Sequence, residues 1–473
     1  MPVRKNPERK AVCCSMMKFD FAGNGTLTMT AGGKTVVSPS PVGLLTVGGQ
    51  LLAPMGAKET GDDLILSYGA YTVTLTRSYR KNGSLKLTLA SFPAGADAFI
   101  FGGYACPEAV RFGDMVGAAW AGDGSAVCIQ SLNPKTMGEK TFPYTNGTSF
   151  PTPTKKVAGK VGDTVLLSCA AVDLTRVHVP LPDGSPVGAA IVLTWAKDAA
   201  SLLDDIGTME LEEGMPHPMI DGTWAKKSPL ASDIYFVFDD GDTAMQLRTS
   251  EKADVHGIYF GDPFTSWGHF EINRNLYPNG EKDFAAAIEE AKRHGVNVGF
   301  HTLSNFIHTN DPYVTPVPHK DLLDHDPTPL ARSIGETDTD VFIGEALGYA
   351  SRGNLGCIRI GDELIQYAAF DAAEKRLSGC TRGAFGTRRS AHEAGETVTH
   401  LKDHGYMTLF PSITLQREMA DRIGTLIRTC KVRRVSFDGL EGCFATDAGE
   451  YARDTNVMGA LCVRTGDFVD RRL

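Results

Sequence analysis

Asp438 and Glu441 are the residues whose type and spacing point most directly to chemistry. Asp438 follows the short strand-like run 433–437. Gly439 comes next, and Glu441 lies three residues after Asp438. A carboxylate just past the end of a buried strand is where a (β/α) barrel holds its catalytic groups. Two acids beside two glycines are typical of a sugar-cleaving site and also of an ordinary turn.

Further carboxylates follow two earlier apolar runs. The run 233–238 ends in Asp239 and Asp240, and the run 256–260 is followed by Asp262. Carboxylates accept hydrogen bonds from neighbouring hydroxyl groups, so these three residues are candidates for binding a sugar. An Asp-Gly turn or a hydrated Ca²⁺ loop is the alternative for the paired aspartates.

Trp267 and His301 complete the candidate site. Trp267 is a candidate platform for stacking on a sugar face, although a tryptophan in the core or at its rim is equally consistent with the sequence. His301 ends the run 296–301 and is a candidate substrate contact.

His301 also begins a tract rich in histidine and aspartate, and no pair of histidines stands four residues apart on a helix there. We therefore favour a solvated loop over a metal site. The other residues of this tract are His308, Asp311, His319, Asp321, Asp324, His325 and Asp326.

The second half of the chain alternates apolar runs with amphipathic segments. Between the second and third runs, Phe284, Ile288 and Ala291 repeat at helical spacing, and Gly295 ends the pattern. A later helix begins after Pro411 and precedes the run that ends in Asp438. Its apolar face consists of Leu415, Met419, Ile423, Leu426 and Cys430. This order predicts parallel βα units, with Asp438 at the end of the fourth strand.

The first half of the chain is predicted to be β-structure. Alternating runs are separated by Asn24-Gly25, Asn82-Gly83 and Asn146-Gly147, a typical hairpin signal. The same asparagines lie in glycosylation sequons, which the hairpins explain without glycosylation. We predict a multidomain β plus α/β fold: an N-terminal β-sandwich, then a (β/α)8 TIM-type barrel that carries a small β insertion. The predicted parts are a flexible N-terminus (1–17), the sandwich (18–228), the first part of the barrel (229–329), the inserted β module (330–402) and the rest of the barrel (403–473).

Composition excludes several classes of protein. The 473 residues are 42% hydrophobic and carry a net charge of −9, which argues against a nucleic-acid partner. No run approaches the ~20 apolar residues of a membrane helix, so no membrane partner is predicted. The basic N-terminus lacks the apolar region of a signal peptide, and localisation stays open although the class is usually exported. The ten scattered cysteines are expected to be mostly buried thiols.

No cofactor and no metal is predicted. A Gly-x-Ser-x-Gly motif after a strand, a Walker loop and a dinucleotide fingerprint are all missing from the sequence. The oligomeric state is left open.

The run from Asp233 to Asp438 resembles the first half of a retaining glycoside hydrolase barrel of the α-galactosidase-like clan. The residues that carry the resemblance are the acidic end of the first strand, Tyr277-Pro278-Asn279-Gly280 before a helix, and Asn297-Val298-Gly299-Phe300. The resemblance implies that the fourth strand carries the nucleophile, Asp438. In that clan the acid/base usually comes from a later strand. The residues themselves leave two roles open for Glu441: the acid/base, or a neighbour that binds a sugar hydroxyl.

The insertion resembles a β module of phage tail and baseplate proteins. The similar stretches are 360–367, 377–387 and 391–396. This resemblance implies a compact hairpin fold without particular chemistry, and Arg382 and His392 are expected to be structural.

The sequence predicts a carbohydrate-active enzyme that hydrolyses an oligo- or polysaccharide by a retaining mechanism. Residues 230–473 without the insertion are fewer than the ~200 that a complete barrel needs. We therefore expect an incomplete barrel, and the fragment is a candidate for being inactive. Two alternatives stay open: a polysaccharide lyase with His301 as a base, and a non-catalytic glycan-binding or phage-tail-like adhesion protein.

Overall fold

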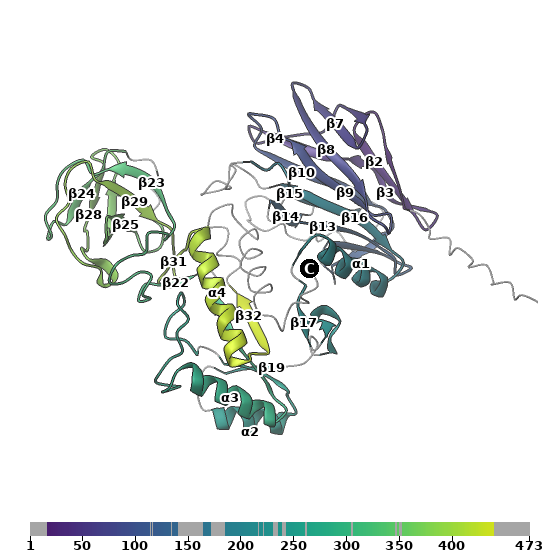
Figure 1. The fold of residues 1–473 in the computed structure, drawn as a ribbon. Coiled ribbons are helices and arrows are strands. Elements are labelled where there is room, and N and C mark those ends of the chain that lie inside the picture. Colours follow the sequence, from purple (N-terminus) through teal and green to yellow (C-terminus); the bar gives the residue numbers. More distant parts are fainter. Residues whose placement is uncertain are drawn as a thin grey trace, which may run out of the picture. The chain divides into compact units, whose positions relative to one another are not determined.

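The structure is a computed structural model. It describes residues 17–113, 115, 117–133, 135–140, 164–171, 185–215, 217–220, 222–229, 235–238, 243–260, 263–303, 306–345, 348–349 and 352–438. These residues form a multidomain, β-rich fold with α-helices α1 to α4. They divide into two compact units between Thr208 and Met209, and Figure 1 colours the first unit purple to blue and the second teal to yellow.

The first unit consists of antiparallel sheets around one apolar core, to which Leu27, Leu87 and Phe101 contribute side chains from different sheets. One sheet has the order β1 (Lys18–Phe21), β2 (Thr26–Ala31), β3 (Lys34–Pro41). A second has the order β14 (Thr136–Lys140), β15 (Val165–Ala171), β10 (Ala98–Cys106), β4 (Gly43–Val47), β5 (Gln50–Leu52). The third has the order β11 (Ala109–Phe112), β12 (Ala118–Ala121), β13 (Ala126–Ser131), β16 (Ala190–Ala196), β9 (Leu85–Ser91), β8 (Tyr71–Tyr79), β7 (Asp63–Tyr68), β6 (Gly56–Thr60).

Two of the predicted hairpins are confirmed, and both use the asparagine side chain. Asn24 Oδ1 accepts a hydrogen bond from the backbone N–H of Thr26 at 3.2 Å, between β1 and β2. Asn82 Oδ1 accepts the corresponding bond from Ser84 at 3.0 Å, between β8 and β9. The turn itself therefore accounts for asparagine at these positions. Asn146-Gly147 lies outside the described residues.

The second unit contains a sheet of parallel strands in chain order: β19 (Tyr235–Phe238), β20 (Gly257–Phe260), β21 (Asn297–Leu303), β32 (Arg434–Asp438). The ladders β19–β20, β20–β21 and β21–β32 are all parallel, so the predicted βα units are confirmed. A complete eight-unit barrel does not follow from these strands. Ahead of them, α1 (Ala199–Glu212) leads to the pair β17 (Met219–Ile220) and β18 (Thr223–Trp224) and to the 3-10 helix η1 (Ala225–Lys227).

Three helices accompany these strands: α2 (Thr243–Ala253), α3 (Glu281–Arg293) and α4 (Ile413–Cys430). In α3 the predicted face is confirmed, because Phe284, Ile288 and Ala291 are at most 3% exposed. In α4 all five predicted apolar residues are 0% exposed. Both faces pack into one core with Ile258, Val298 and Phe300 of the sheet. Hydrophobic residues at helical spacing thus fix one covered face of the parallel sheet.

Between β21 and α4 the chain forms a β module, whose first strand begins at Asp324, six residues before the predicted bound. One sheet has the order β23 (Asp324–Pro329), β29 (Thr397–Leu401), β25 (Cys357–Ile360), β26 (Glu363–Gln366), and another β24 (Asp340–Phe342), β28 (Arg376–Ser378), β27 (Ala369–Asp371). The 3-10 helix η3 (Ala384–Gly386) follows β28. A small root sheet, β22 (Ile307–His308), β31 (Thr408–Leu409), β30 (Asp403–His404), joins the outgoing and returning chain.

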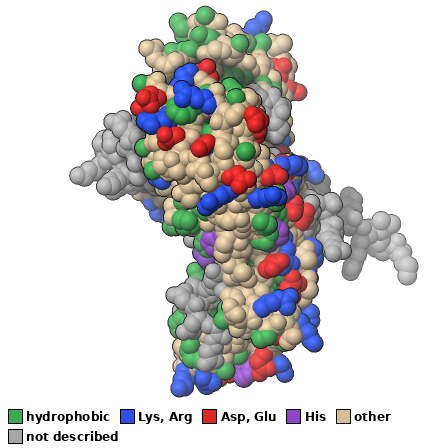
Figure 2. Space-filling view, turned by 90° about the vertical axis from the view of Figure 1, so that its left-hand side faces the viewer, with side chains coloured by type: hydrophobic (Ala, Val, Ile, Leu, Met, Phe, Trp, Pro, Cys, Tyr) green, Lys and Arg blue, Asp and Glu red, His purple; other side chains and the backbone are tan. Residues whose placement is uncertain are grey.

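Charges are distributed rather than gathered on the face shown in Figure 2, where acidic and basic side chains alternate across the surface. None of the helices within the described residues is long and apolar enough to cross a membrane.

Candidate active site

The parallel strands end at one edge of their sheet. The predicted site residues lie at the ends of these strands or shortly after them in the sequence. β19 and β20 end level with each other, because Phe238 pairs with Phe260 in the ladder. Parallel strands bring the residues after their carboxyl ends to the same edge of a sheet. Four predicted residues lie outside the described residues, and their roles stay predictions: Asp239, Asp240, Asp262 and Glu441.

His301 and Asp438 lie on neighbouring strands at this edge. In the β21–β32 ladder His301 is opposite Ser436, and Leu303 is opposite Asp438. Side chains alternate along a strand, so positions 301, 303, 436 and 438 share one face of the sheet. Phe300, one residue earlier, belongs to the core on the helix-covered face. The side chain of Asp438 is outside what the structure describes, so it is the backbone register that brings the two candidates together.

Arg434 occupies the same face nearer the amino ends of the strands. A Cβ atom on Gly299 would lie 2.3 Å from the carbonyl oxygen of Arg434, and one on Gly257 would lie 2.9 Å from its guanidinium carbon. The rings of Tyr235 and Tyr259 meet edge to face beside it at 4.8 Å. Burial raises the pKa of Tyr259, and the charge of Arg434 opposes this shift. His301 therefore lies one layer beyond this arginine and tyrosine layer, and the position of Asp438 lies two layers beyond it.

Trp267 is fixed beside this edge by His308. The backbone N–H of Trp267 donates to His308 Nδ1 at 3.1 Å, and the N–H of His308 donates to the carbonyl oxygen of Trp267 at 3.1 Å. Their rings stack with centroids 4.1 Å apart. Trp267 also packs against the cluster that contains Leu303 and Phe306. One ring face of Trp267 is thus occupied, and the residue adjoins the ladder partner of Asp438.

Asp311 fastens the loop that carries Trp267, a role that the sequence did not reveal. Its carboxylate accepts hydrogen bonds from Ser266 Oγ at 2.6 Å, from the N–H of His269 at 3.0 Å, from His269 Nδ1 at 2.7 Å and from the N–H of Tyr313 at 2.9 Å. Gly268 leaves room for it, because a Cβ there would lie 2.6 Å from the carboxyl carbon. Burial raises the pKa of Asp311, but the bonds from His269 and Ser266 outweigh burial and lower it overall.

Helix α4 holds the same loop from the other side. Arg422 donates to the carbonyl oxygens of His269 at 2.9 Å and Phe270 at 3.1 Å, and to Glu281 at 2.6 Å. Tyr313 donates to Glu418 of α4 at 2.7 Å. The loop with Trp267 is therefore tied both to the tract after β21 and to α4.

The histidine- and aspartate-rich tract does not converge on one point. His319 Nδ1 accepts from the N–H of Asp321 at 3.2 Å, and His325 contacts Asp326 at 2.7 Å. Within the described part of the chain, no group of three or more histidine, cysteine, aspartate or glutamate residues is arranged to hold a metal ion.

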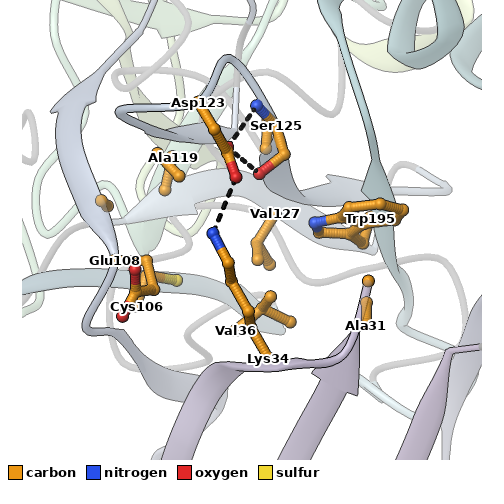
Figure 3. A pocket seen from close by; sticks show the side chains of 14 residues that line it. Ala31, Lys34, Val36, Cys106, Glu108, Ala119, Asp123, Ser125, Val127 and Trp195 are labelled. Carbon is orange, nitrogen blue, oxygen red and sulfur yellow. Dashed lines mark hydrogen bonds and ion pairs between the residues drawn. The ribbon is translucent and has the colours of Figure 1, made fainter.

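A hollow in the first unit is lined by an exposed ion pair and a buried thiol. Figure 3 shows the ion pair between Lys34 and Asp123, 2.9 Å long, and Trp195 among the residues that line the hollow. Both charged side chains are about half exposed, at 54% and 49%, so water screens their attraction. Burial raises the pKa of the Cys106 thiol in the wall to about 12, which keeps it from acting as a thiolate.

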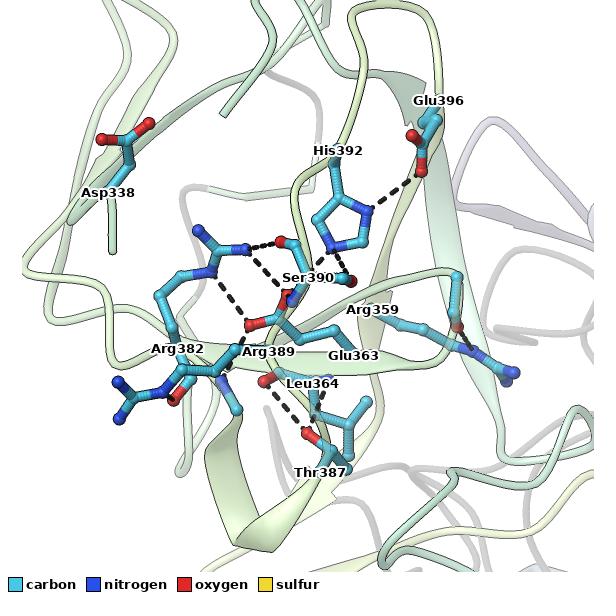
Figure 4. A network of polar contacts seen from close by, with 12 residues as sticks. Asp338, Arg359, Glu363, Leu364, Arg382, Thr387, Arg389, Ser390, His392 and Glu396 are labelled. Atoms are coloured by element: carbon cyan, nitrogen blue, oxygen red, sulfur yellow. Dashed lines mark hydrogen bonds and ion pairs between the residues drawn. The ribbon is translucent and has the colours of Figure 1, made fainter. Parts of the chain in front are cut away.

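Glu363 is the centre of a buried polar network in the β module. Arg382 donates two hydrogen bonds to the carboxylate of Glu363, of 2.9 and 2.7 Å (Figure 4). His392 Nε2 lies 2.9 Å from the same carboxylate, while its Nδ1 lies 3.0 Å from Glu396. Every polar contact of this network is internal to the module, as expected for structural residues.

Comparison with known proteins adds no assignment. No protein-family model and no curated protein sequence matches the chain. Among solved structures, the α-N-acetylgalactosaminidase NagBb of Bifidobacterium bifidum, in complex with GalNAc, is similar at 11% identity and a TM-score of 0.45, over 95% of this chain and 73% of that one. The α-galactosidase TtGalA of Thermus thermophilus is similar at 13% identity and a TM-score of 0.31, over 90% and 69%. Likenesses of this size carry no argument about the chain.

We predict that Asp311→Asn loosens the Trp267 loop. One amide oxygen cannot replace a carboxylate that accepts four hydrogen bonds, so we expect a loss of roughly 3 kcal/mol in the free energy of unfolding. Because the pKa of Asp311 is lowered, its contribution is complete above about pH 4 and is lost as the pH falls through the folded-state pKa. Chemical denaturation at several pH values measures both effects.

Asp338→Asn is the matched control for this experiment. Asp338 is exposed and accepts a bond from the N–H of Gly335 at 2.7 Å, so its substitution should change stability much less. Equal effects of the two substitutions would contradict the anchoring role of Asp311.

We predict that Arg382→Ala destabilises the β module by roughly 3 kcal/mol, because it leaves the 0%-exposed carboxylate of Glu363 without its main counter-charge. Arg388→Ala, on the exposed surface of the same segment, should be nearly neutral. The double variant Arg382→Met with Glu363→Gln removes both charges and should recover part of the loss. Thermal unfolding followed by circular dichroism measures all three, and a double variant less stable than Arg382→Ala would refute the electrostatic explanation.

Proposed function

We propose that the chain is a carbohydrate-active enzyme that hydrolyses glycosidic bonds by a retaining mechanism, with Asp438 as the nucleophile. The observation that carries this proposal is the position of Asp438. It ends the fourth parallel strand, opposite Leu303 and on the face that carries His301. Catalytic groups of (β/α) barrels lie at this end of the strands.

In the proposed reaction, a carboxylate oxygen of Asp438 bonds to the anomeric carbon while the bond to the leaving oxygen breaks. A second carboxylic acid, ~5–5.5 Å away, protonates the leaving oxygen. The same group, now a carboxylate, then takes a proton from water, and the water oxygen displaces Asp438. Glu441 is one candidate for this acid/base, and a residue of a later strand is the other.

The remaining candidates bind the sugar in this proposal. Asp239, Asp240 and Asp262 accept hydrogen bonds from its hydroxyl groups, as carboxylates at a strand end do well. Trp267 remains the candidate for stacking on the sugar, and His308 covers one of its ring faces. His301 contacts the substrate beside Asp438.

The proposed architecture behind this site is a β-sandwich (18–228) and a (β/α)8-type barrel. The barrel comprises residues 229–329 and 403–473, and the β module (330–402) interrupts it. Two observations support the barrel: the strands β19 to β32 are adjacent in chain order, and α3 and α4 pack on one face of the sheet they form. The other face, with Arg434, Tyr259 and His301, would line the barrel interior.

We predict that Asp438→Asn lowers kcat by on the order of a thousandfold or more, because the amide cannot form the glycosyl-enzyme. Substrate affinity should change little. An activated fluorosugar should label Asp438 in the wild-type chain, and peptide mass spectrometry identifies the labelled residue. Asp338→Asn, on the surface of the β module, serves as the control and should keep full activity.

Other outcomes would indicate a different nucleophile, a lyase or a binding protein. Labelling of a different residue would refute the nucleophile. Unsaturated products that absorb near the ultraviolet edge would indicate a lyase, for which His301→Ala should abolish turnover. Glycan binding that survives Asp438→Asn in a chain without any turnover would indicate a binding protein.

A further inference from the structure

His400 is a buried histidine of β29, a strand that belongs to both cores of the β module. Its neighbour Leu401 lies in the core that also contains α4 and the parallel sheet, whereas Val398 lies in a distal core of the module. His400 itself is 2% exposed. A charge on its ring would be buried at the junction of the two cores, so the contacts of the ring determine whether the fold can hold that charge.

Among the described residues, only one of the two ring nitrogens of His400 has a hydrogen-bond partner. Nε2 lies 3.2 Å from the hydroxyl oxygen of Tyr367. Nδ1 is buried and makes no hydrogen bond, since the backbone of Arg352 lies nearby without the geometry of one. A protonated ring would carry a charged Nδ1–H group without an acceptor, and an unpaired buried charge costs far more than an unpaired neutral nitrogen.

A second histidine faces His400 across the sheet. His325 of β23 is directly opposite it in the β23–β29 ladder, and the centroids of the two rings are 4.9 Å apart. The carboxylate of Asp326 contacts Nδ1 of His325 at 2.7 Å, whereas no described carboxylate forms an ion pair with His400. A proton on His400 would therefore lie beside a histidine and lack a counter-charge of its own.

The other groups around His400 do not supply that counter-charge. The carboxylate of Asp403 already accepts hydrogen bonds from the backbone N–H groups of residues 354–356. Burial raises the pKa of Tyr349 and of Tyr367, so both hydroxyl groups stay neutral. The titratable and charged groups around the ring are His325, Asp326, Tyr349, Tyr367, Lys402 and Asp403.

We propose that His325 and His400 form an acid-sensitive joint between the two cores of the β module. At neutral pH the uncharged ring of His400 stacks on Tyr349, whose ring centroid is 5.3 Å away. The hydroxyl group of Tyr349 donates to the carbonyl oxygen of Asp326 at 2.9 Å, in a bulge of β23 where the ladder register shifts. His400 can take up a proton only when its ring reaches water, so acid separates β23 from β29 at this pair.

The pH window of the joint follows from the direction in which the fold shifts His400. Burial, and then the charge of His325, lower the pKa of His400 from 6.5 to about 4. Asp403, the backbone of Arg352 and Asp326 oppose this shift without reversing it. The open state keeps the ordinary pKa, so the joint is fully stable above pH 6.5 and loses stability as the pH falls from there to about 4. The opening equilibrium constant should increase roughly thirtyfold from pH 7.5 to pH 5.

Hydrogen–deuterium exchange of the full chain, followed by mass spectrometry of its peptides, tests the joint. Exchange rates at pH 7.5 and pH 5 are compared after correction for the intrinsic pH dependence of exchange. Peptides from β23 and β29 should lose protection by about tenfold or more at pH 5, whereas peptides from α3 and from β7 should keep theirs. Protection of β23 and β29 that is the same at both pH values would overturn the proposal.

His400→Phe is the decisive variant, because it keeps a flat ring against Tyr349 and removes the titrating group. It should abolish the loss of protection at pH 5. Nitrogen NMR of the histidine rings tests the same point in the wild-type chain, with the signal of His400 identified by its absence in His400→Asn. This ring should stay neutral at pH 5, and a ring that titrates near pH 6.5 would contradict the proposal.

His325→Gln removes the neighbouring charge and should reduce the acid response without abolishing it. His256→Gln is the matched control, since the His256 side chain is 58% exposed and its loss should leave the response as it is. A full acid response in His400→Phe would assign the response to other groups of the module, such as His392 and Glu396, and would refute the joint. None of these measurements depends on hydrolysis, so the joint and the proposed function can fail separately.

Discussion

The close approach of β21 and β32 at Gly299 is the constraint on which the second unit depends. A Cβ at Gly299 would overlap the carbonyl oxygen of Arg434, so any other residue would push the two strands apart. Five consecutive pairs follow in this parallel ladder, from Gly299 with Arg434 to Leu303 with Asp438. The register that places Asp438 level with Leu303 is therefore set several residues earlier, by a glycine that takes no part in chemistry.

The β21–β32 ladder also constrains the path of the chain between its two strands. β21 ends at Leu303 and β32 begins at Arg434, so the whole β module must leave and return at one edge of the sheet. Closing a long loop costs entropy that grows slowly with its length, and the root sheet reduces that cost by pairing the outgoing chain with the returning one. Two buried carboxylates then hold different parts of this segment in place. Asp311 binds the loop of Trp267 to the outgoing chain, and Glu363 holds the distal part of the module.

Regular elements could be predicted from the sequence because their signals are local. The spacing of Phe284, Ile288 and Ala291 reflects one helical face, and Asn-Gly reflects the backbone conformation of one turn. The role of Asp311 could not be predicted, since its partner Ser266 is 45 positions away and no local pattern joins them. The hairpin of β30 and β31 could not be predicted for a related reason: its strands have two residues each, and its left-handed position holds Met407 instead of the glycine that would mark a turn. The aspartates after β19 and β20 remain sequence predictions.

The division of the module into two cores has a consequence for the candidate site. Leu355, Cys357, Leu364 and Leu401 belong to the core that also contains α4 and the parallel sheet, whereas Val341, Ile358 and Leu377 form a separate distal core. Changes in the distal core act on residues outside the core that contains the parallel sheet, so we expect them to alter the stability of the module more than the position of its root. The root sheet, by contrast, is held by the sheet-side core, by the Phe306 cluster and by the stack of His308 on Trp267. A long insertion can therefore vary in its outer part while its root sheet keeps its geometry.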